Sequence, residues 1–149
     1  LDMVTDRFST AALCSILAIM SGSKTLQMVF IMLNILDFVS HWMCMYVSLA
    51  VGAASHKDMT ADAPKMLQLY YSKDDRRFMC ALCVGNELLY VALYAIWSGV
   101  VSYGWIYFVY LVIMPLWALK QWMNIVQLWQ ASRVLVKYEY NTDPHHKNN

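Results

Sequence analysis

Long apolar stretches separated by short polar breaks run through most of this chain of 149 residues. Each of four stretches is near or above the ~20 residues that a helix needs to cross the hydrocarbon core of a bilayer. They cover about residues 1–20, 25–54, 78–101 and 105–138. The pattern predicts an all-α fold, a polytopic membrane bundle with four transmembrane helices over 1–138, followed by a cytosolic polar tail at 139–149 that is disordered from 141 onward.

The polar breaks decide which helix ends share a side of the membrane. The turns at 21–24 and 102–104 fall on one side, and the Leu1 end, the 55–77 loop and the tail fall on the other. The second side carries nine Lys and Arg residues, and the first carries Lys24 alone. The nine are Arg7, Lys57, Lys65, Lys73, Arg76, Arg77, Arg133, Lys137 and Lys147. By the positive-inside rule, we expect the Leu1 side to face the cytosol.

The composition agrees with a membrane protein. Hydrophobic residues make up 60% of the chain and charged residues only 14%, against about 25% charged in soluble domains. The net charge of +1 excludes a strongly basic nucleic-acid binder. Cys80 and Cys83 form a Cys-x-x-Cys pair, but a structural zinc site needs a second pair and the sequence has none, so packing is the better interpretation.

The N-terminal end carries two carboxylates. The chain opens on Leu1 inside a helical pattern and without an initiator methionine, so we expect further sequence upstream. Asp2 and Asp6 are four residues apart and share one helix face. A divalent cation would explain the pair, because carboxylates are its preferred ligands. A solvated helix start would also explain it, and the pair alone favours that interpretation.

Polar residues recur inside the predicted spans, where they usually face the bundle interior. Asn34, His41, Ser48 and Ser55 follow a seven-residue spacing, with Asp37 one turn before His41. Hydrogen bonds between helices explain such a stripe. Asp37 and His41 could also satisfy each other.

The third and fourth stretches carry further polar groups. Asn86 and Glu87 lie in the third stretch and Lys120 in the fourth. Lys120 could reach the cytosolic interface along its own alkyl chain, or it could pair with Glu87 across the bundle. We interpret these three residues, with Asp37 and His41, as structural. A transporter or channel fragment would instead use such residues as a polar pathway, and it would not need carboxylates at the N-terminal end.

The segment Leu1–Arg7, Leu-Asp-Met-Val-Thr-Asp-Arg, resembles the end of the signature of the CDP-alcohol phosphatidyltransferases. In that signature D-x2-D-G-x2-A-R comes first and G-x3-D-x3-D follows, and Asp2 and Asp6 match its third and fourth aspartates. Further segments resemble the phosphatidylinositol synthases of eukaryotes within that family. They lie at 37–42, 55–57, 69–71, 83–90 and 118–120. The resemblance implies that the chain holds the last four helices of a six-helix core, with the first two aspartates upstream.

The resemblance implies phosphatidylinositol synthesis, in which the phosphatidyl group passes from CDP-diacylglycerol to myo-inositol and CMP is released. Asp2 would be a metal ligand, and Asp6 both a metal ligand and the general base. The implied cofactors are two Mg²⁺ or Mn²⁺ ions whose remaining ligands lie upstream, so we expect the 149 residues alone to be inactive. The predicted second helix delivers Ser55, His56 and Lys57 to the cytosolic surface, and we expect them to bind inositol.

The implied partners are CDP-diacylglycerol, myo-inositol, the lipid bilayer and a second copy of the chain, with no nucleic acid among them. The implied location is the endoplasmic reticulum membrane, with the active site facing the cytosol. Two alternatives stay open. Another transferase of the family, using glycerophosphate or choline, would share the aspartates, and a fragment of a polytopic transporter would share the polar residues of the spans.

Overall fold

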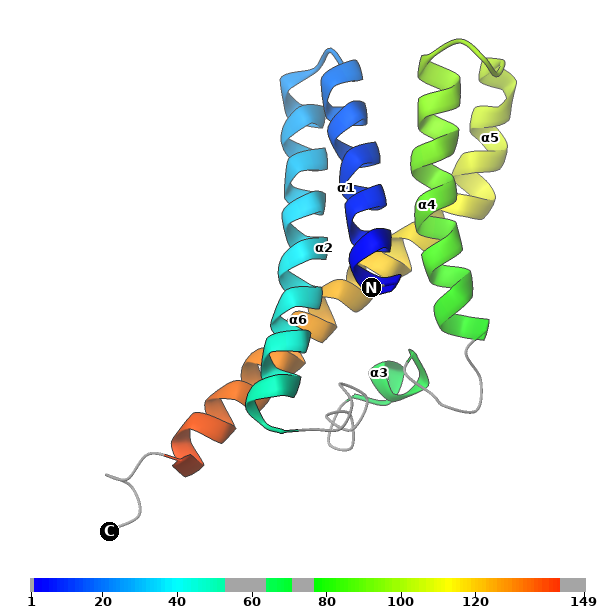
Figure 1. Ribbon diagram of the computed structural model, residues 1–149. Helices are drawn as coiled ribbons and strands as arrows, with labels where there is room; N and C mark the ends of the chain where they lie inside the picture. Colours follow the sequence, from blue (N-terminus) through cyan, green and yellow to red (C-terminus); the bar gives the residue numbers. More distant parts are fainter. Residues whose placement is uncertain (1, 53–63, 71–76, 143–149) are drawn as a thin grey trace.

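The computed structural model describes residues 2–52, 64–70 and 77–142, and its regular structure in these ranges is helical throughout. The α-helices are α1 (Asp2–Met20), α2 (Lys24–Ala50), α3 (Lys65–Tyr70), α4 (Arg77–Trp97), α5 (Ile106–Phe108) and α6 (Met114–Thr142). The 3₁₀-helix η2 (Tyr103–Trp105) precedes α5, and the π-helix η3 (Val109–Ile113) joins α5 to α6. Figure 1 shows upright helices with the long α6 running diagonally past them. The all-α prediction is confirmed.

The helices α1 and α2 form an antiparallel hairpin, as the polar break between them predicts (Figure 1). Gly22 has φ +62°, in the left-handed region that favours glycine, and it allows the sharp reversal of the chain. The helix α2 ends at Ala50, before Gly52 at φ +69°, rather than continuing to 54. The residues of its predicted last turn from 53 onward lie outside the described part.

The helix α4 ends earlier than the predicted limit of 101. Its last residue is Trp97, and Gly99 at φ +75° follows. The N–H groups of Val100 and Val101 fold back and donate to the Ala95 carbonyl at 3.0 and 3.2 Å. This arrangement satisfies the end of the helix, and it depends on a glycine in the left-handed region.

The last helical stretch continues past Pro115, as predicted, and reaches Thr142 rather than 138. Proline has no N–H to donate to the preceding turn, and the segment just before it, Val109–Ile113, widens into the π-helix. Beyond this point α6 leaves the direction of α5 and runs diagonally toward α2 (Figure 1). Residues 141 and 142, predicted to be disordered, belong to α6. Residues 143–149 lie outside the described part.

The bundle is held together by α1 and α6, because both helices pack against α2 and α4. Where α4 meets α6, a Cβ placed on Gly85 would lie 2.6 Å from the Cβ of Leu116. No side chain is accommodated at that distance, so the two helices approach this closely because residue 85 is glycine.

The short helix α3 lies within the predicted 55–77 loop, where we expected no helix. Leu67 and Tyr70 of α3 are buried, and they pack with Leu82 of α4 and Met123 of α6. These two apolar side chains hold the six-residue helix against the end of the bundle. The helix α3 therefore covers the junction between α4 and α6.

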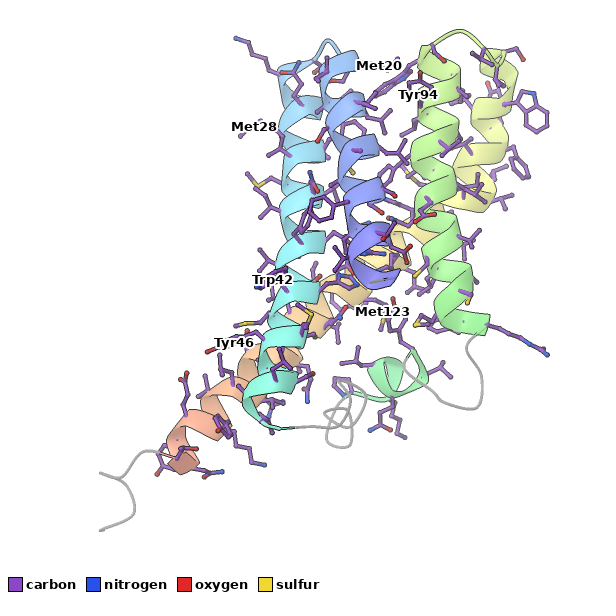
Figure 2. All side chains as sticks on the ribbon, in the orientation of Figure 1. Met20, Met28, Trp42, Tyr46, Tyr94 and Met123 are labelled. Atoms are coloured by element: carbon purple, nitrogen blue, oxygen red, sulfur yellow. The ribbon has the colours of Figure 1, made fainter. Side chains whose placement is uncertain are left out.

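The chain is a polytopic membrane protein. Within the described residues, three helical segments are long and apolar enough to cross a bilayer, namely Lys24–Ala50, Arg77–Trp97 and Ile106–Thr142. Met28, Trp42 and Tyr46 of α2 project away from the bundle (Figure 2) and are 56%, 63% and 54% exposed, as expected for side chains in contact with lipid. The helix α1 is not among the three segments, and its crossing of the bilayer stays a prediction.

Candidate functional site

The first turns of α1 carry both predicted aspartates. Asp2 begins the helix, and its side chain lies outside the described part. The side chain of Asp6 is exposed. Positions four residues apart lie on one face of a helix, so the two aspartates occupy the same face near the start of α1.

The residue after Asp6 is oriented inward. Arg7 is 8% exposed, and it opens the buried face of α1, which continues through Thr10, Cys14 and Leu17. Successive residues of an α-helix are about 100° apart around its axis. With Arg7 inside the bundle, Asp6 is therefore held at its surface.

Arg7 pairs with Asp37 of α2. Its Nη1 donates to Asp37 Oδ1 at 2.8 Å and to Oδ2 at 2.9 Å, and Asp37 is 5% exposed. Counting Arg7 with the cytosolic charges was wrong, because its charge is neutralised inside the bundle. The predicted orientation in the membrane therefore depends on the other eight lysine and arginine residues of that side.

The helix α6 supplies the next contacts. Nδ2 of Asn124 donates to Asp37 Oδ1 at 3.2 Å, and Nζ of Lys120 donates to Asn124 Oδ1. Lys120 is 1% exposed and also lies over the Tyr70 ring, 5.7 Å from its centroid. Both expected placements of Lys120 are wrong, because it does not reach the interface and forms no ion pair with Glu87 within the described residues. We call Arg7, Asp37, Asn124 and Lys120 the buried polar cluster.

His41 lies beside Asp37, as the spacing of four predicts. Its Nδ1 is 2.8 Å from the Asp37 carbonyl oxygen and 3.7 Å from Asp37 Oδ1, and the Ser40 hydroxyl donates to the same carbonyl at 3.0 Å. The carboxylate itself is taken by Arg7, which is 30 residues away in sequence. Local spacing could not show this partner, and the only signal for it was a lone arginine within an apolar face.

Of the remaining predicted residues, two lie in α4 and three lie outside the described part of the chain. Oδ1 of the buried Asn86 accepts from Nε2 of Gln121 at 2.9 Å, which links α4 to α6. Glu87 is half-buried. Ser55, His56 and Lys57 lie outside the described part, and their role in inositol binding stays a prediction.

Curated proteins of one name are similar to this chain over most of its length. CDP-diacylglycerol–inositol 3-phosphatidyltransferase 1 of Arabidopsis thaliana is 35% identical over 93% of this chain and 64% of its own length. The enzyme of that name from Candida albicans is 37% identical over 93% of this chain and 58% of its own length. The human enzyme is 39% identical over 63% of this chain and 42% of its own length. No family model and no solved structure matches the chain.

The chain is similar in sequence to the CDP-diacylglycerol–inositol 3-phosphatidyltransferases of plants, fungi and mammals. It spans 64% of the length of the first Arabidopsis relative and 58% of the Candida relative. The similarity therefore covers nearly all of this chain and about three fifths of these two relatives.

The family context makes the donor groups of the chain relevant to metal binding. Among the described side chains, no group of three or more His, Cys, Asp or Glu could hold a metal ion. Asp6 offers an exposed carboxylate, and Asp2 is one turn before it. Cys14 and Cys44 are buried, whereas Cys83 is half-buried and Cys80 is exposed. Packing in the core therefore does not account for Cys80.

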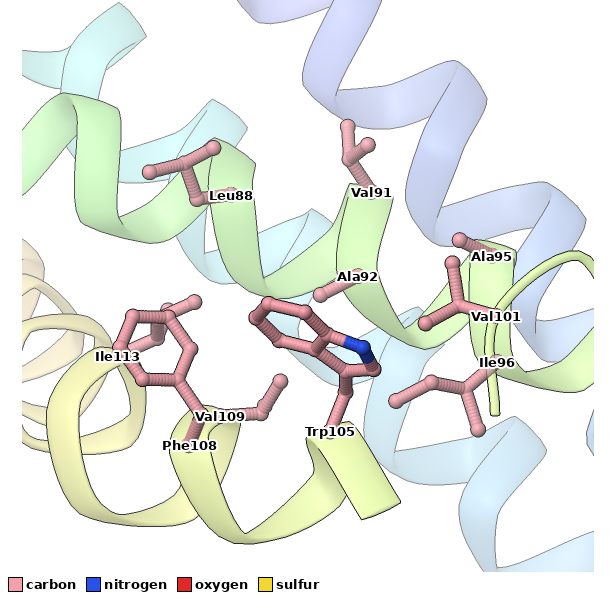
Figure 3. A pocket seen from close by; sticks show the side chains of 10 residues that line it. All are labelled: Leu88, Val91, Ala92, Ala95, Ile96, Val101, Trp105, Phe108, Val109 and Ile113. Atoms are coloured by element: carbon pink, nitrogen blue, oxygen red, sulfur yellow. The ribbon is translucent and has the colours of Figure 1, made fainter. Parts of the chain in front are cut away.

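An apolar groove lies elsewhere in the bundle, away from the start of α1. A groove of about 390 Å³ runs between α4 and α5, with Val91 and Ala92 on one wall and Trp105 and Phe108 on the other (Figure 3). Its lining carries no ionisable side chain. The groove therefore has no group that could activate a hydroxyl or bind a diphosphate.

Proposed function

We propose that the protein transfers the phosphatidyl group of CDP-diacylglycerol to myo-inositol and releases CMP, with Asp6 as the general base. The names of the relatives give the reaction. The observation that carries the assignment to Asp6 is its exposed carboxylate near the start of α1, on a helix whose next residue is anchored inside the bundle. Such a carboxylate is accessible to a water-soluble alcohol.

In the proposed step, an inositol oxygen attacks the β-phosphorus of CDP-diacylglycerol. The new P–O bond forms as the bond between this phosphorus and the bridging oxygen of CMP breaks, and the leaving CMP keeps the electron pair. The inositol hydroxyl loses its proton to the carboxylate of Asp6. A carboxylate within hydrogen-bonding reach of the hydroxyl is suited to this transfer.

Divalent metal ions belong to the same proposal. Mg²⁺ and Mn²⁺ prefer oxygen ligands, and the carboxylates of Asp2 and Asp6 are of that kind. We assign both residues as ligands, with further ligands from outside the described residues. When bound, the ions would neutralise charge on the diphosphate and on the leaving phosphate.

The location and the inositol contacts complete the proposal. The start of α1 belongs to the side that is richer in lysine and arginine, which supports an active site facing the cytosol in the endoplasmic reticulum membrane. Ser55, His56 and Lys57 follow α2 on this side, and we assign them to inositol binding. A homodimer is the proposed assembly.

The test is CMP release from CDP-diacylglycerol by the complete protein in liposomes, with and without inositol. We expect release to require inositol and to be lost in Asp6→Asn, because an amide cannot take up the proton. The matched control is Glu139→Gln, which removes an exposed carboxylate from the far end of α6. Release driven by glycerol phosphate or choline in place of inositol would contradict the substrate, and activity of Asp6→Asn equal to that of the parent would contradict the base.

A further inference from the structure

We propose that Asp37 is a positioning residue for Asp6. By holding Arg7 inside the bundle, Asp37 sets the rotation of α1 about its axis and so keeps Asp6 at the surface. This inference rests on the proposed function for the role of Asp6, but the contact between α1 and α2 can be tested without any assay of activity.

Helix geometry couples the direction of Asp6 to that of Arg7. Asp6 and Arg7 are neighbours in sequence, about 100° apart around the helix. A rotation of α1 that releases Arg7 from the interior therefore carries Asp6 away from its present direction by the same angle. A displacement of about 1 Å at a reacting group can lower a rate by about a hundredfold.

Asp37, which holds Arg7, is itself fixed by contacts with two helices. Both carboxylate oxygens of Asp37 accept from Arg7 Nη1, at 2.8 and 2.9 Å. Asn124 of α6 donates to Oδ1 of Asp37 at 3.2 Å, and Lys120 in turn donates to Asn124. The buried polar cluster thus joins α1 to two other helices, and all of its members are at least nine-tenths buried.

The core cluster that includes α1 lies away from Asp6. The core cluster that includes α1 contains its residues Leu13, Cys14, Leu17 and Ala18, all in the second half of the helix. Near Asp6, Phe8 makes an edge contact with Phe38, their ring centroids 5.9 Å apart, yet Phe8 is 64% exposed. The pair of Arg7 with Asp37 is therefore a buried contact between helices at the residue next to Asp6.

The activity test replaces both charges together in the complete protein. A single loss would strand a buried charge, whereas a buried ion pair can often be exchanged for apolar side chains without loss of folding. We expect Arg7→Met with Asp37→Leu to fold and to lower kcat by about a hundredfold, with the KM for inositol changed by less than about twofold. Arg7→Lys should keep most of kcat, because a single nitrogen makes both bonds to Asp37.

The control removes another buried polar contact between helices. Trp117 Nε1 donates to the hydroxyl of Tyr90 at 3.2 Å. Tyr90→Phe deletes this bond between α6 and α4, together with the contact of the same hydroxyl with Cys14 in the second half of α1. We expect Tyr90→Phe to leave kcat and the KM for inositol unchanged. A loss of kcat in this variant as large as in the double variant would show general loosening and would overturn the proposal.

The second test reads the rotation of α1 directly. Thr10 is 2% exposed and lies on the same face as Arg7, so a cysteine there should react slowly with a water-soluble maleimide in the parent. We expect Arg7→Met with Asp37→Leu to raise the reaction rate of Thr10→Cys about tenfold, as the protected face opens. The exposed Cys80 is replaced by serine in all of these proteins.

The two tests separate the two proposals. If the parent transfers no phosphatidyl group to inositol, the proposed function fails, and the labelling of Thr10→Cys still decides whether Asp37 holds α1. If the double variant folds and keeps both the parental kcat and the protection of Thr10→Cys, Asp37 has no positioning role. If Thr10→Cys is deprotected while kcat is unchanged, the contact is structural only, and the proposal is again wrong.

Discussion

At the scale of single residues, the sequence indicated which polar groups enter the bundle but not which of them meet. The positions of Asp37 and His41 one turn apart correctly predicted that they adjoin. The pairing of Lys120 with Glu87 was predicted from their opposite charges, and Lys120 instead donates a hydrogen bond to Asn124. Contacts between helices depend on their relative rotation, and the spacing of polar residues within one helix does not encode it.

The inositol contacts can be tested one residue at a time. We expect His56→Ala and Lys57→Ala to raise the KM for inositol more than Asn86→Ala does, because a pocket that pairs the hydroxyls of a polyol loses affinity when a partner is removed. Asn86 already bonds to Gln121 within the bundle. The measurement is the initial rate against inositol concentration. An unchanged KM in both surface variants would remove this segment from the inositol site.

Metal dependence should distinguish the two aspartates. We expect Asp2→Asn to raise the Mg²⁺ or Mn²⁺ concentration needed for half of the maximal rate, because an amide has one acceptor oxygen fewer and no charge. Asp6→Asn should lower the rate at every metal concentration. Titration of metal into chelator-treated protein gives both curves. Identical curves for Asp2→Asn and the parent would contradict its role as a ligand.

At the scale of the elements, the hydrophobic pattern located the long helices well and their ends less well. It set the limit of α4 at 101, and the helix ends at Trp97 because Gly99 adopts a left-handed conformation. It gave no sign of α3, which owes its position to Leu67 and Tyr70 packing on helices distant in sequence. Apolar periodicity reports burial against lipid or protein, and helix ends depend on single residues that reverse the chain.

The crossing of α4 and α6 gives a prediction of stability. We expect Gly85→Ala to destabilise the fold by about 1–3 kcal/mol, because the new methyl group would overlap Leu116 and force the helices apart. Gly104→Ala is the matched control, since its Cβ would meet nothing closer than Ser102 Oγ at 3.8 Å. Thermal unfolding in detergent measures both. Equal unfolding temperatures for the two variants would show that the crossing relaxes without cost.

At the scale of the whole molecule, the alternation of short turns and long helices correctly predicted which ends lie together. The turn after α1 and the turn after α4 lie at one end, and α3 and the end of α6 lie toward the other (Figure 1). The connectivity alone fixes this arrangement once the helices are known. The pairing of α1 and α6 with the same two helices was not predictable, because it depends on Gly85 and on the buried polar cluster.

The sidedness of the protein can be tested with its native cysteine. Cys80 is exposed in the first turn of α4, on the side that we assign to the cytosol. In sealed endoplasmic reticulum vesicles, whose cytosolic face is outward, a membrane-impermeant maleimide should label it. A cysteine placed at the exposed Ser23, in a Cys80→Ser background, should react only after the vesicles are opened. The reverse pattern would invert the orientation.

The pair of Arg7 with Asp37 also bears on how the chain enters the membrane during synthesis. A lone charged side chain at the middle of a helix costs about 2.5–3.5 kcal/mol on insertion into the bilayer, and these two charges occur on consecutive helices of one hairpin. Because α1 and α2 are synthesised before α6, Arg7 and Asp37 can neutralise each other before Asn124 and Lys120 are present. The helix α6 then completes the buried polar cluster that α1 and α2 have begun.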